Sequence, residues 1–166
     1  DIRIRFGVEA DYYPKYMPYI ADFVAQNSFD FVIGSVHFIG DWDYSNPALS
    51  DQMNEIGPES LWLRYYELVL KAIRSEVFDI IGHLDLPKRL TCQLPDNHAT
   101  LVESVLLAAQ EYDVALDVNT SGLRRAPWEA YPHPAVLRRA AELKLPIVLG
   151  SDAHRPDDVA AGFEEM

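Results

Sequence analysis

Short apolar segments alternate with helix-like segments along the chain. Residues 2–8 alternate apolar side chains with charged or small ones, and four later runs are short and rich in Val, Ile and Phe. Alternation is typical of a half-buried strand, whereas a continuous apolar run is typical of a parallel strand that is covered on both faces. The predicted strands are residues 2–8, 29–36, 77–82, 114–118 and 146–149.

The segments between these strands carry apolar residues at helical spacing. The most regular of them places Trp62, Tyr65, Tyr66 and Val69 on one face. Pro134 suits the first position of a helix, where the missing N–H costs nothing. The predicted helices are residues 15–26, 59–76, 97–111 and 135–144, with a further helix beginning near Pro156.

Strand and helix therefore alternate five times, which predicts an α/β fold with a parallel sheet and right-handed crossovers. The chain has 166 residues and no obvious linker, so we expect one domain over residues 1–166. The long stretch without a clear period, residues 39–58, follows the second strand. Loops of this length are usually functional. We expect its Asp41, Trp42 and Asp43 to cover a bound substrate.

Charge and composition exclude several classes of partner. The formal net charge is −12, and such an acidic surface repels nucleic-acid backbones. No apolar run approaches the ~18 residues of a membrane span. The single cysteine, Cys92, excludes an internal disulfide and a cysteine-based zinc cage. We therefore expect a cytoplasmic protein that acts on a small molecule, away from membranes and nucleic acids.

A polar or metal-binding side chain stands at the end of every predicted strand. The carboxyl ends of parallel strands open on one face, where binding sites are built. Three of the five histidines of the chain lie at such ends. The residues concerned are Glu9 and Asp11, His37, His83, Asn119 to Ser121, and Asp152 with His154.

These positions predict a metal centre. Adjacent strands lie ~4.8 Å apart, so Glu9, His37 and His83 can converge on one ion. Asp152 and His154 are two residues apart and can both face inward. Each residue alone is explained as well by a solvated loop or a hydrogen-bonded pair, but their combination favours metal binding. The donors suit Zn, Mn or Fe, and their number favours a cluster of at least two ions.

Three arginines follow the last two groups of polar residues. Arg124 and Arg125 come after the sequence NTSG, and Arg155 comes after GSDAH. Guanidinium groups bind phosphate through two parallel hydrogen bonds. Of the three, we expect Arg124 to be the phosphate ligand, because the glycine before it, Gly122, permits an unusual turn. Any one of the three is explained as well by a solvated loop arginine.

Motifs of other catalytic classes are absent from the sequence. It contains no phosphate-binding P-loop, no dinucleotide-binding glycine motif, no nucleophile elbow and no H-E-x-x-H. Nucleophilic serine or cysteine catalysis therefore has little support. His98 and His133 are predicted to be structural, the first on a helix and the second next to a helix start.

Five segments together resemble the histidinol-phosphatase branch of the PHP superfamily (polymerase and histidinol phosphatase). The resemblance implies a distorted seven-stranded (β/α) barrel with a metal cluster at its C-terminal face. It implies Glu9, His37, His83, Asp152 and His154 as metal ligands, and Arg124 with Arg155 as substrate-phosphate ligands. The segments are GVEADYY (7–13), IGSVHFIGDWDYSNP (33–47), IIGHLDLPKR (80–89), LDVNTSGLRR (116–125) and IVLGSDAHRPDDV (147–159).

The chain departs from the family pattern in one respect. Family members open with a strand that carries H-x-H, and no H-x-H occurs here. The five predicted strands are also fewer than seven. We therefore expect an internal fragment, a partial barrel of about five parallel strands with an incomplete site.

The resemblance implies a metal-dependent phosphomonoesterase that hydrolyses L-histidinol phosphate in histidine biosynthesis. In this hypothesis Arg124 and His154 are catalytic, with His154 as proton donor to the leaving group. Three alternatives stay open. The substrate is another phosphate ester, the barrel is a degenerate one that binds without turnover, or, more remotely, the protein is a deaminase or amidase.

Overall fold

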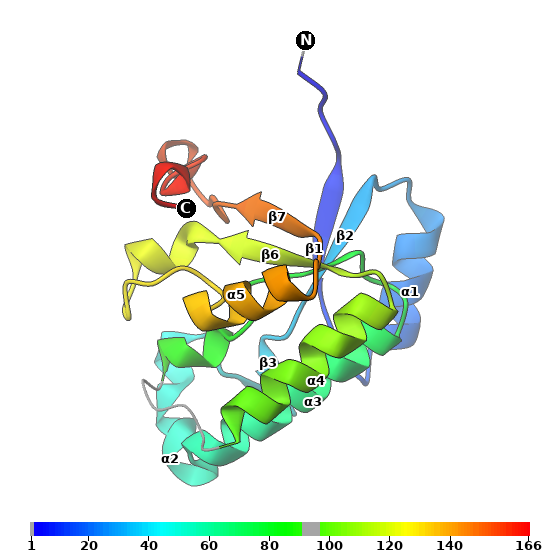
Figure 1. The fold of residues 1–166 in the computed structure, drawn as a ribbon. Coiled ribbons are helices and arrows are strands. Elements are labelled where there is room, and N and C mark those ends of the chain that lie inside the picture. Colours follow the sequence, from blue (N-terminus) through cyan, green and yellow to red (C-terminus); the bar gives the residue numbers. More distant parts are fainter. Residues whose placement is uncertain (1, 91–96) are drawn as a thin grey trace.

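The computed structural model describes residues 2–90 and 97–166, so Cys92 lies outside the described residues. Its centre is a five-stranded parallel sheet in the order β1-β2-β5-β6-β7 (Figure 1). This confirms the predicted α/β class with five parallel strands. The strands are β1 Gly7–Asp11, β2 Phe31–Ser35, β5 Ile80–Ile81, β6 Ala115–Asn119 and β7 Ile147–Gly150.

The helices follow the predicted order with small shifts at their ends. Prolines stand at the start of α3 and α5, as their fixed φ and missing N–H favour. The helix expected near Pro156 is a single 3-10 turn, Pro156–Asp158. The α-helices are α1 Met17–Gln26, α2 Met53–Ile56, α3 Pro58–Arg74, α4 His98–Glu111 and α5 Pro134–Glu142.

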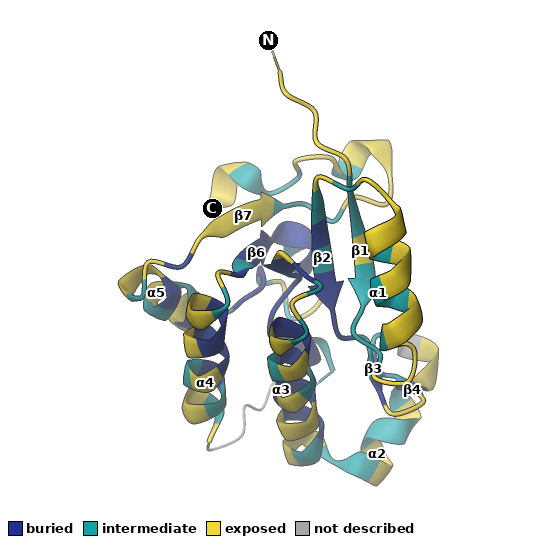
Figure 2. Cartoon of the chain, turned by 90° about the vertical axis from the view of Figure 1, so that its right-hand side faces the viewer, coloured by how far each residue is buried: buried dark blue, intermediate teal, exposed yellow. Residues whose placement is uncertain are grey.

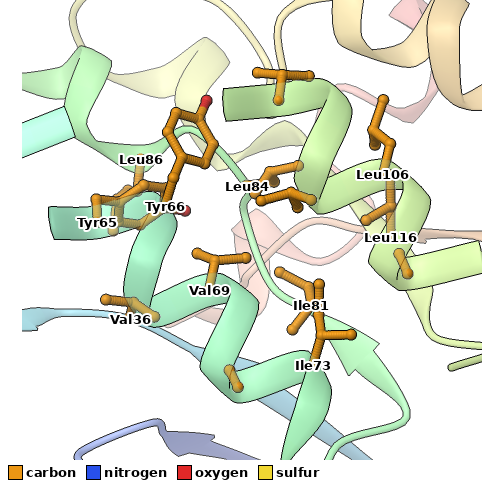
Figure 3. Packing of buried hydrophobic residues seen from close by; sticks show 14 of the residues in the cluster. Val36, Tyr65, Tyr66, Val69, Ile73, Ile81, Leu84, Leu86, Leu106 and Leu116 are labelled. Carbon is orange, nitrogen blue, oxygen red and sulfur yellow. The ribbon is translucent and has the colours of Figure 1, made fainter. Parts of the chain in front are cut away.

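Helices α3 and α4 lie side by side and cover the middle of the sheet (Figures 1 and 2). Seven residues of α3 are buried, as the helical spacing of its apolar residues predicts. Figure 3 shows Tyr65, Tyr66, Val69 and Ile73 of α3 in a cluster that includes Leu106 of α4. Each such side chain contributes about 1.5–3 kcal/mol by leaving water. This packing fixes α3 and α4 against the sheet.

The first strand lies later in the chain than the prediction places it. Residues 2–6 are not in a strand, and Ile2 and Ile4 are 93% and 90% exposed. The strand occupies Gly7–Asp11, where every residue pairs with β2. The prediction of a strand over residues 2–8 was therefore wrong in position, because alternation alone does not order a segment that has no neighbouring strand.

The last strand is more exposed than its sequence predicts. Ile147 and Leu149 of β7 are 60% and 43% exposed, and Figure 2 shows the strand largely in the colour of exposed residues. Within the described residues β7 has β6 on one side and no strand on the other. The prediction of burial on both faces was wrong here, because it assumed a neighbour and helices on each side.

The 39–58 stretch is more ordered than an irregular loop. It includes the turn and second strand of a hairpin, β3 Phe38–Ile39 with β4 Trp42–Asp43, followed by a 3-10 helix, Pro47–Gln52, and then by α2. Trp42 is 3% exposed, and its indole N–H donates to the Leu49 carbonyl at 2.9 Å. The expectation that Trp42 covers a substrate was therefore wrong, because its ring belongs to the core.

Candidate metal centre

Glu9, His37 and His83 come together at the carboxyl side of three adjacent strands. Glu9 lies within β1, and the two histidines each lie two residues beyond the ends of β2 and β5. One ligand atom from each residue lies within 4.8 Å of the others. Among the described residues this is the one group of three or more such donors with that spacing. The convergence expected from strand order is thus present in the structure.

Hydrogen bonds orient the Glu9 carboxylate and the His37 ring. The Ser35 hydroxyl donates to Glu9 Oε1 at 2.6 Å, and His83 Nε2 lies 3.1 Å from the same oxygen. His37 Nδ1 lies 2.7 Å from Asp11 Oδ1, and the two imidazole rings are 4.9 Å apart. A carboxylate on one ring nitrogen is the usual arrangement that leaves the other nitrogen for a metal.

His83 is held from its backbone and buried. The backbone N–H of His83 donates to Asp117 Oδ2 at 3.2 Å, and Asn119 Nδ2 donates to the same oxygen at 2.8 Å. The residue is 4% exposed, and Nδ1 is a buried nitrogen with no hydrogen-bond partner in the described structure. An unpaired buried polar atom is costly. A histidine and carboxylate donor set with a spare imidazole nitrogen fits a divalent metal ion.

Electrostatics keep the Glu9 carboxylate ionised. Burial raises the pKa of Glu9, but the hydrogen bonds and charges of His83, together with Ser35 and His37, outweigh burial and lower it to about 2. Burial lowers the pKa of His83, but the neighbouring Glu9, Asp117 and Asp152 reverse the direction and raise it. The Glu9 carboxylate therefore carries a negative charge at neutral pH, which suits a cation ligand.

The three residues line a cavity of about 320 Å³. Asp152 and His154 line it too, with Asp152 Oδ1 3.4 Å from His154 Nδ1. They do not join the group of three, and the His154 side chain is 74% exposed. The other lining residues are Asp11, Ser45, Leu86, Arg89, Ser121, Arg125 and Tyr131.

The structure does not bring Arg124 and Arg155 to the walls of this cavity. Arg124 Nη2 donates to the carbonyl of Ser151 at 2.7 Å, and Nε lies 3.6 Å from Asp158 Oδ1. Its guanidinium thus holds the segment after β7, and Arg155 is exposed. The roles of Arg124 and Arg155 as substrate-phosphate ligands therefore stay predictions, since order along the chain does not fix the direction of a side chain.

Arg89 and Arg125 line the cavity instead. Arg125 follows Arg124 directly and was a candidate from the sequence, whereas Arg89 was missed. The available signal was its place in LPKR, six residues beyond His83. Tyr131 was also missed, because it reaches the cavity through a bridge to Asn119, a pairing that no local pattern reveals. Burial raises the pKa of Tyr131 to about 12, so its hydroxyl is neutral.

The remaining histidines are structural, as predicted. His98 is the first residue of α4, and its Nε2 lies 2.9 Å from the Tyr66 hydroxyl. His133 precedes α5, and its Nδ1 accepts a hydrogen bond from the Ala135 N–H at 3.1 Å. Such a bond satisfies one of the free N–H groups at a helix start.

The class of protein follows from a comparison with family models. The PHP domain model matches residues 1–121, with the strands that carry Glu9, His37 and His83. The chain therefore belongs to the PHP domain family.

Two curated relatives resemble the chain over almost its whole length. The chain is 42% identical over 162 residues to a protein of Deinococcus radiodurans named "Probable histidinol-phosphatase", covering 98% of this chain and 62% of that protein. It is 29% identical to the histidinol-phosphatase of Bacillus subtilis, covering 98% of this chain and 68% of that protein. The chain thus spans about two thirds of the length of these relatives.

Solved structures share the fold. A protein of Listeria monocytogenes named as a candidate histidinol phosphatase matches with a TM-score of 0.84 and 26% identity, over 99% of this chain and 69% of that one. A histidinol phosphate phosphatase of Lactococcus lactis was solved with zinc, L-histidinol and phosphate. It matches with a TM-score of 0.74 and 24% identity, over 90% of this chain and 58% of that one.

No helix among the described residues combines the length and the apolar character that crossing a membrane requires.

Proposed function

We propose that the protein is a histidinol-phosphatase, which hydrolyses L-histidinol phosphate to L-histidinol and phosphate in histidine biosynthesis. The observation that carries this proposal is the Glu9, His37 and His83 group in a cavity that two arginines also line. Cation ligands beside guanidinium groups suit a phosphate ester, whose charge they neutralise. The names of the 42% and 29% identical relatives support the choice of substrate.

Glu9, His37 and His83 would hold a divalent ion, and Asp152 lies at the same cavity for a second. The proposed cofactor is a cluster of Zn, Mn or Fe, with zinc the first ion to test because histidine nitrogen and carboxylate oxygen are its usual ligands here. The chemistry that such ions supply is polarisation of a phosphoryl oxygen and activation of the attacking water.

His154 has one ring nitrogen available for a metal ion or for proton transfer. Its Nδ1 lies 3.0 Å from the Asp152 carbonyl, a bond that requires a proton on Nδ1 and leaves Nε2 for another partner. The exposed ring stands apart from the three-residue group. We propose that the ring, when both of its nitrogens are protonated, donates the Nε2 proton to the leaving alkoxide and becomes neutral, while Arg89 and Arg125 bind the phosphoryl oxygens.

The proposed activity is tested by assaying the full-length protein, loaded with Zn²⁺ or Mn²⁺, on a panel of phosphate monoesters. We expect the highest kcat/KM on L-histidinol phosphate and no activity after metal removal by a chelator. A clear preference for a nucleotide or for phosphotyrosine would identify that ester as the substrate in place of L-histidinol phosphate. Metal binding without turnover of any ester would instead indicate a degenerate barrel.

Replacing Arg125 by methionine is expected to raise KM for the phosphate ester by about 10-fold or more, since a hydrogen bond to a charged group contributes about 1.5–3 kcal/mol. Steady-state kinetics measure this effect. Arg138→Met, at an exposed position on α5, is the matched control and should leave KM unchanged. An equal loss in Arg155→Met, with no loss in Arg125→Met, would restore the choice made from the sequence.

A further inference from the structure

Lys88 is a buried cation that the metal centre and the cavity do not use directly. It lies in the 3-10 helix Leu86–Arg89, directly before the cavity residue Arg89, and only 6% of it is exposed. Buried lysines are rare unless paired, because an ammonium loses its hydration. The contacts of its Nζ therefore indicate what the residue does.

The Lys88 ammonium makes two hydrogen bonds and a further ion-pair contact. Nζ donates to Glu129 Oε1 at 2.8 Å and to the Ala130 carbonyl at 2.6 Å, and it lies 3.3 Å from Asp85 Oδ1. Nζ also stands 4.7 Å from the centre of the Tyr131 ring, within cation–π range. Two of these partners and the ring belong to one loop, which we call the 125–133 segment.

Asp85 fastens the other end of the same segment. Its Oδ2 accepts a hydrogen bond from the His133 N–H at 2.6 Å. Its own N–H donates to the Tyr65 hydroxyl at 3.1 Å, and Tyr65 is a core residue of α3. Asp85 is 1% exposed. The 125–133 segment is thus tied to the rigid part of the fold through the buried side chains of Lys88 and Asp85, in addition to the two backbone hydrogen bonds between Tyr131 and Asn119 of β6.

The segment so held carries one side of the cavity. Arg125 stands at its beginning and Tyr131 near its end, and both line the cavity. Arg89, the neighbour of Lys88, lines the same cavity from the 3-10 helix Leu86–Arg89. The contacts that Lys88 and Asp85 make with the 125–133 segment therefore join the two elements that present the two cavity arginines.

We propose that Lys88 and Asp85 are positioning residues, which hold the 125–133 segment so that Arg125 and Arg89 bind one phosphoryl group together. The catalytic part of this inference rests on the proposed phosphatase function. The geometric part, that Lys88 and Asp85 order the segment, does not depend on that function. A buried charge pair is seldom the most stabilising choice of side chains, so its use here suits specifying a geometry.

The test uses Glu129→Gln, which removes one charge of the network at a side chain that is 37% exposed and outside the cavity lining. In the zinc-loaded full-length protein we expect KM for the phosphate ester to rise by about 10-fold with a smaller change in kcat, the pattern of lost substrate binding. Bound zinc should stay unchanged, because the segment contributes no residue to the Glu9 group.

A second readout does not depend on activity. Trp128 lies in the segment and is 69% exposed. Its backbone N–H donates to the Arg125 carbonyl at 2.6 Å. Subtracting the emission of a Trp128→Phe counterpart isolates its signal from that of Trp42 and Trp62. We expect the anisotropy of Trp128 to fall in Glu129→Gln as the segment loosens.

The matched control is Glu142→Gln. Glu142 Oε2 lies 2.8 Å from Arg139 Nη1, the same separation as Glu129 from Lys88, but on α5 and away from the cavity. It should change neither KM nor the Trp128 signal.

The outcomes separate the two ideas. Unchanged KM and unchanged Trp128 anisotropy in Glu129→Gln, with an active parent protein, would overturn the positioning role. A parent protein that hydrolyses no phosphate ester would overturn the proposed function, while a lower Trp128 anisotropy in Glu129→Gln would still support the ordering of the segment. Lys88→Arg, which keeps the charge, should retain most of the anisotropy, and a loss as large as in Glu129→Gln would contradict the role of the charge.

Discussion

Replacing His83 by asparagine is expected to abolish phosphatase activity and to lower metal affinity by at least about 100-fold, since loss of an outer-shell partner alone costs 10–100-fold. His83 is a buried member of the three-residue group and has a ring nitrogen without a hydrogen-bond partner. Asparagine keeps the backbone N–H that donates to Asp117 but lacks the imidazole. Elemental analysis of bound metal and steady-state kinetics measure the two effects together.

The matched control is the same substitution at a histidine outside the group of Glu9, His37 and His83. His133→Asn keeps a side-chain acceptor at the start of α5, where asparagine is favoured. It should bind metal as the parent protein does. His37→Ala, at a less buried ligand, is a second probe of the same centre and should also lose metal. A folded His83→Asn protein with full metal content would remove His83 from the ligand set.

Replacing Leu106 by alanine is expected to lower the free energy of unfolding by about 2–5 kcal/mol, because it leaves a cavity in a packed interior. Leu106 is 0% exposed and belongs to the cluster between α3 and α4 that Figure 3 shows. Urea denaturation followed by circular dichroism at helical wavelengths measures the change. The loss should appear in the unfolding midpoint with little change in slope.

The neighbouring leucine provides the control for this prediction. Leu107 lies on the same helix but is 46% exposed, so Leu107→Ala removes little packing. We expect a change within about 0.5 kcal/mol, as is usual at exposed positions. Equal losses in the two variants would mean that the effect comes from the unfolded chain, and would refute the assigned packing of α4.

The metal group was readable from the sequence because parallel strands impose a simple geometry. Glu9 lies within β1, and His37 and His83 follow β2 and β5. These strands are adjacent in the sheet, and the carboxyl ends of parallel strands share one face. Strand order was therefore enough to bring the three side chains together. The roles of Asp152 and His154 stay predictions, since they share the cavity but stand apart from the group.

The arginines were not readable in the same way. Arg124 and Arg125 are consecutive, yet one turns to the Ser151 carbonyl and the other lines the cavity. The choice depends on how the 3-10 helix Thr120–Arg124 ends and on the contacts of the 125–133 segment. The contacts of the segment are long-range interactions, which leave no periodic trace in the chain.

The sequence by itself determined the α/β class, the order of strands and helices, and the donors at the strand ends, because local apolar periods and strand-end positions set these features. Tertiary structure alone decided the position of the first strand, the burial of Trp42, the exposure of β7 and the arginines of the cavity. Each of these depends on which neighbour a segment meets in space, and pairing, burial and side-chain direction are properties of that neighbour as much as of the segment.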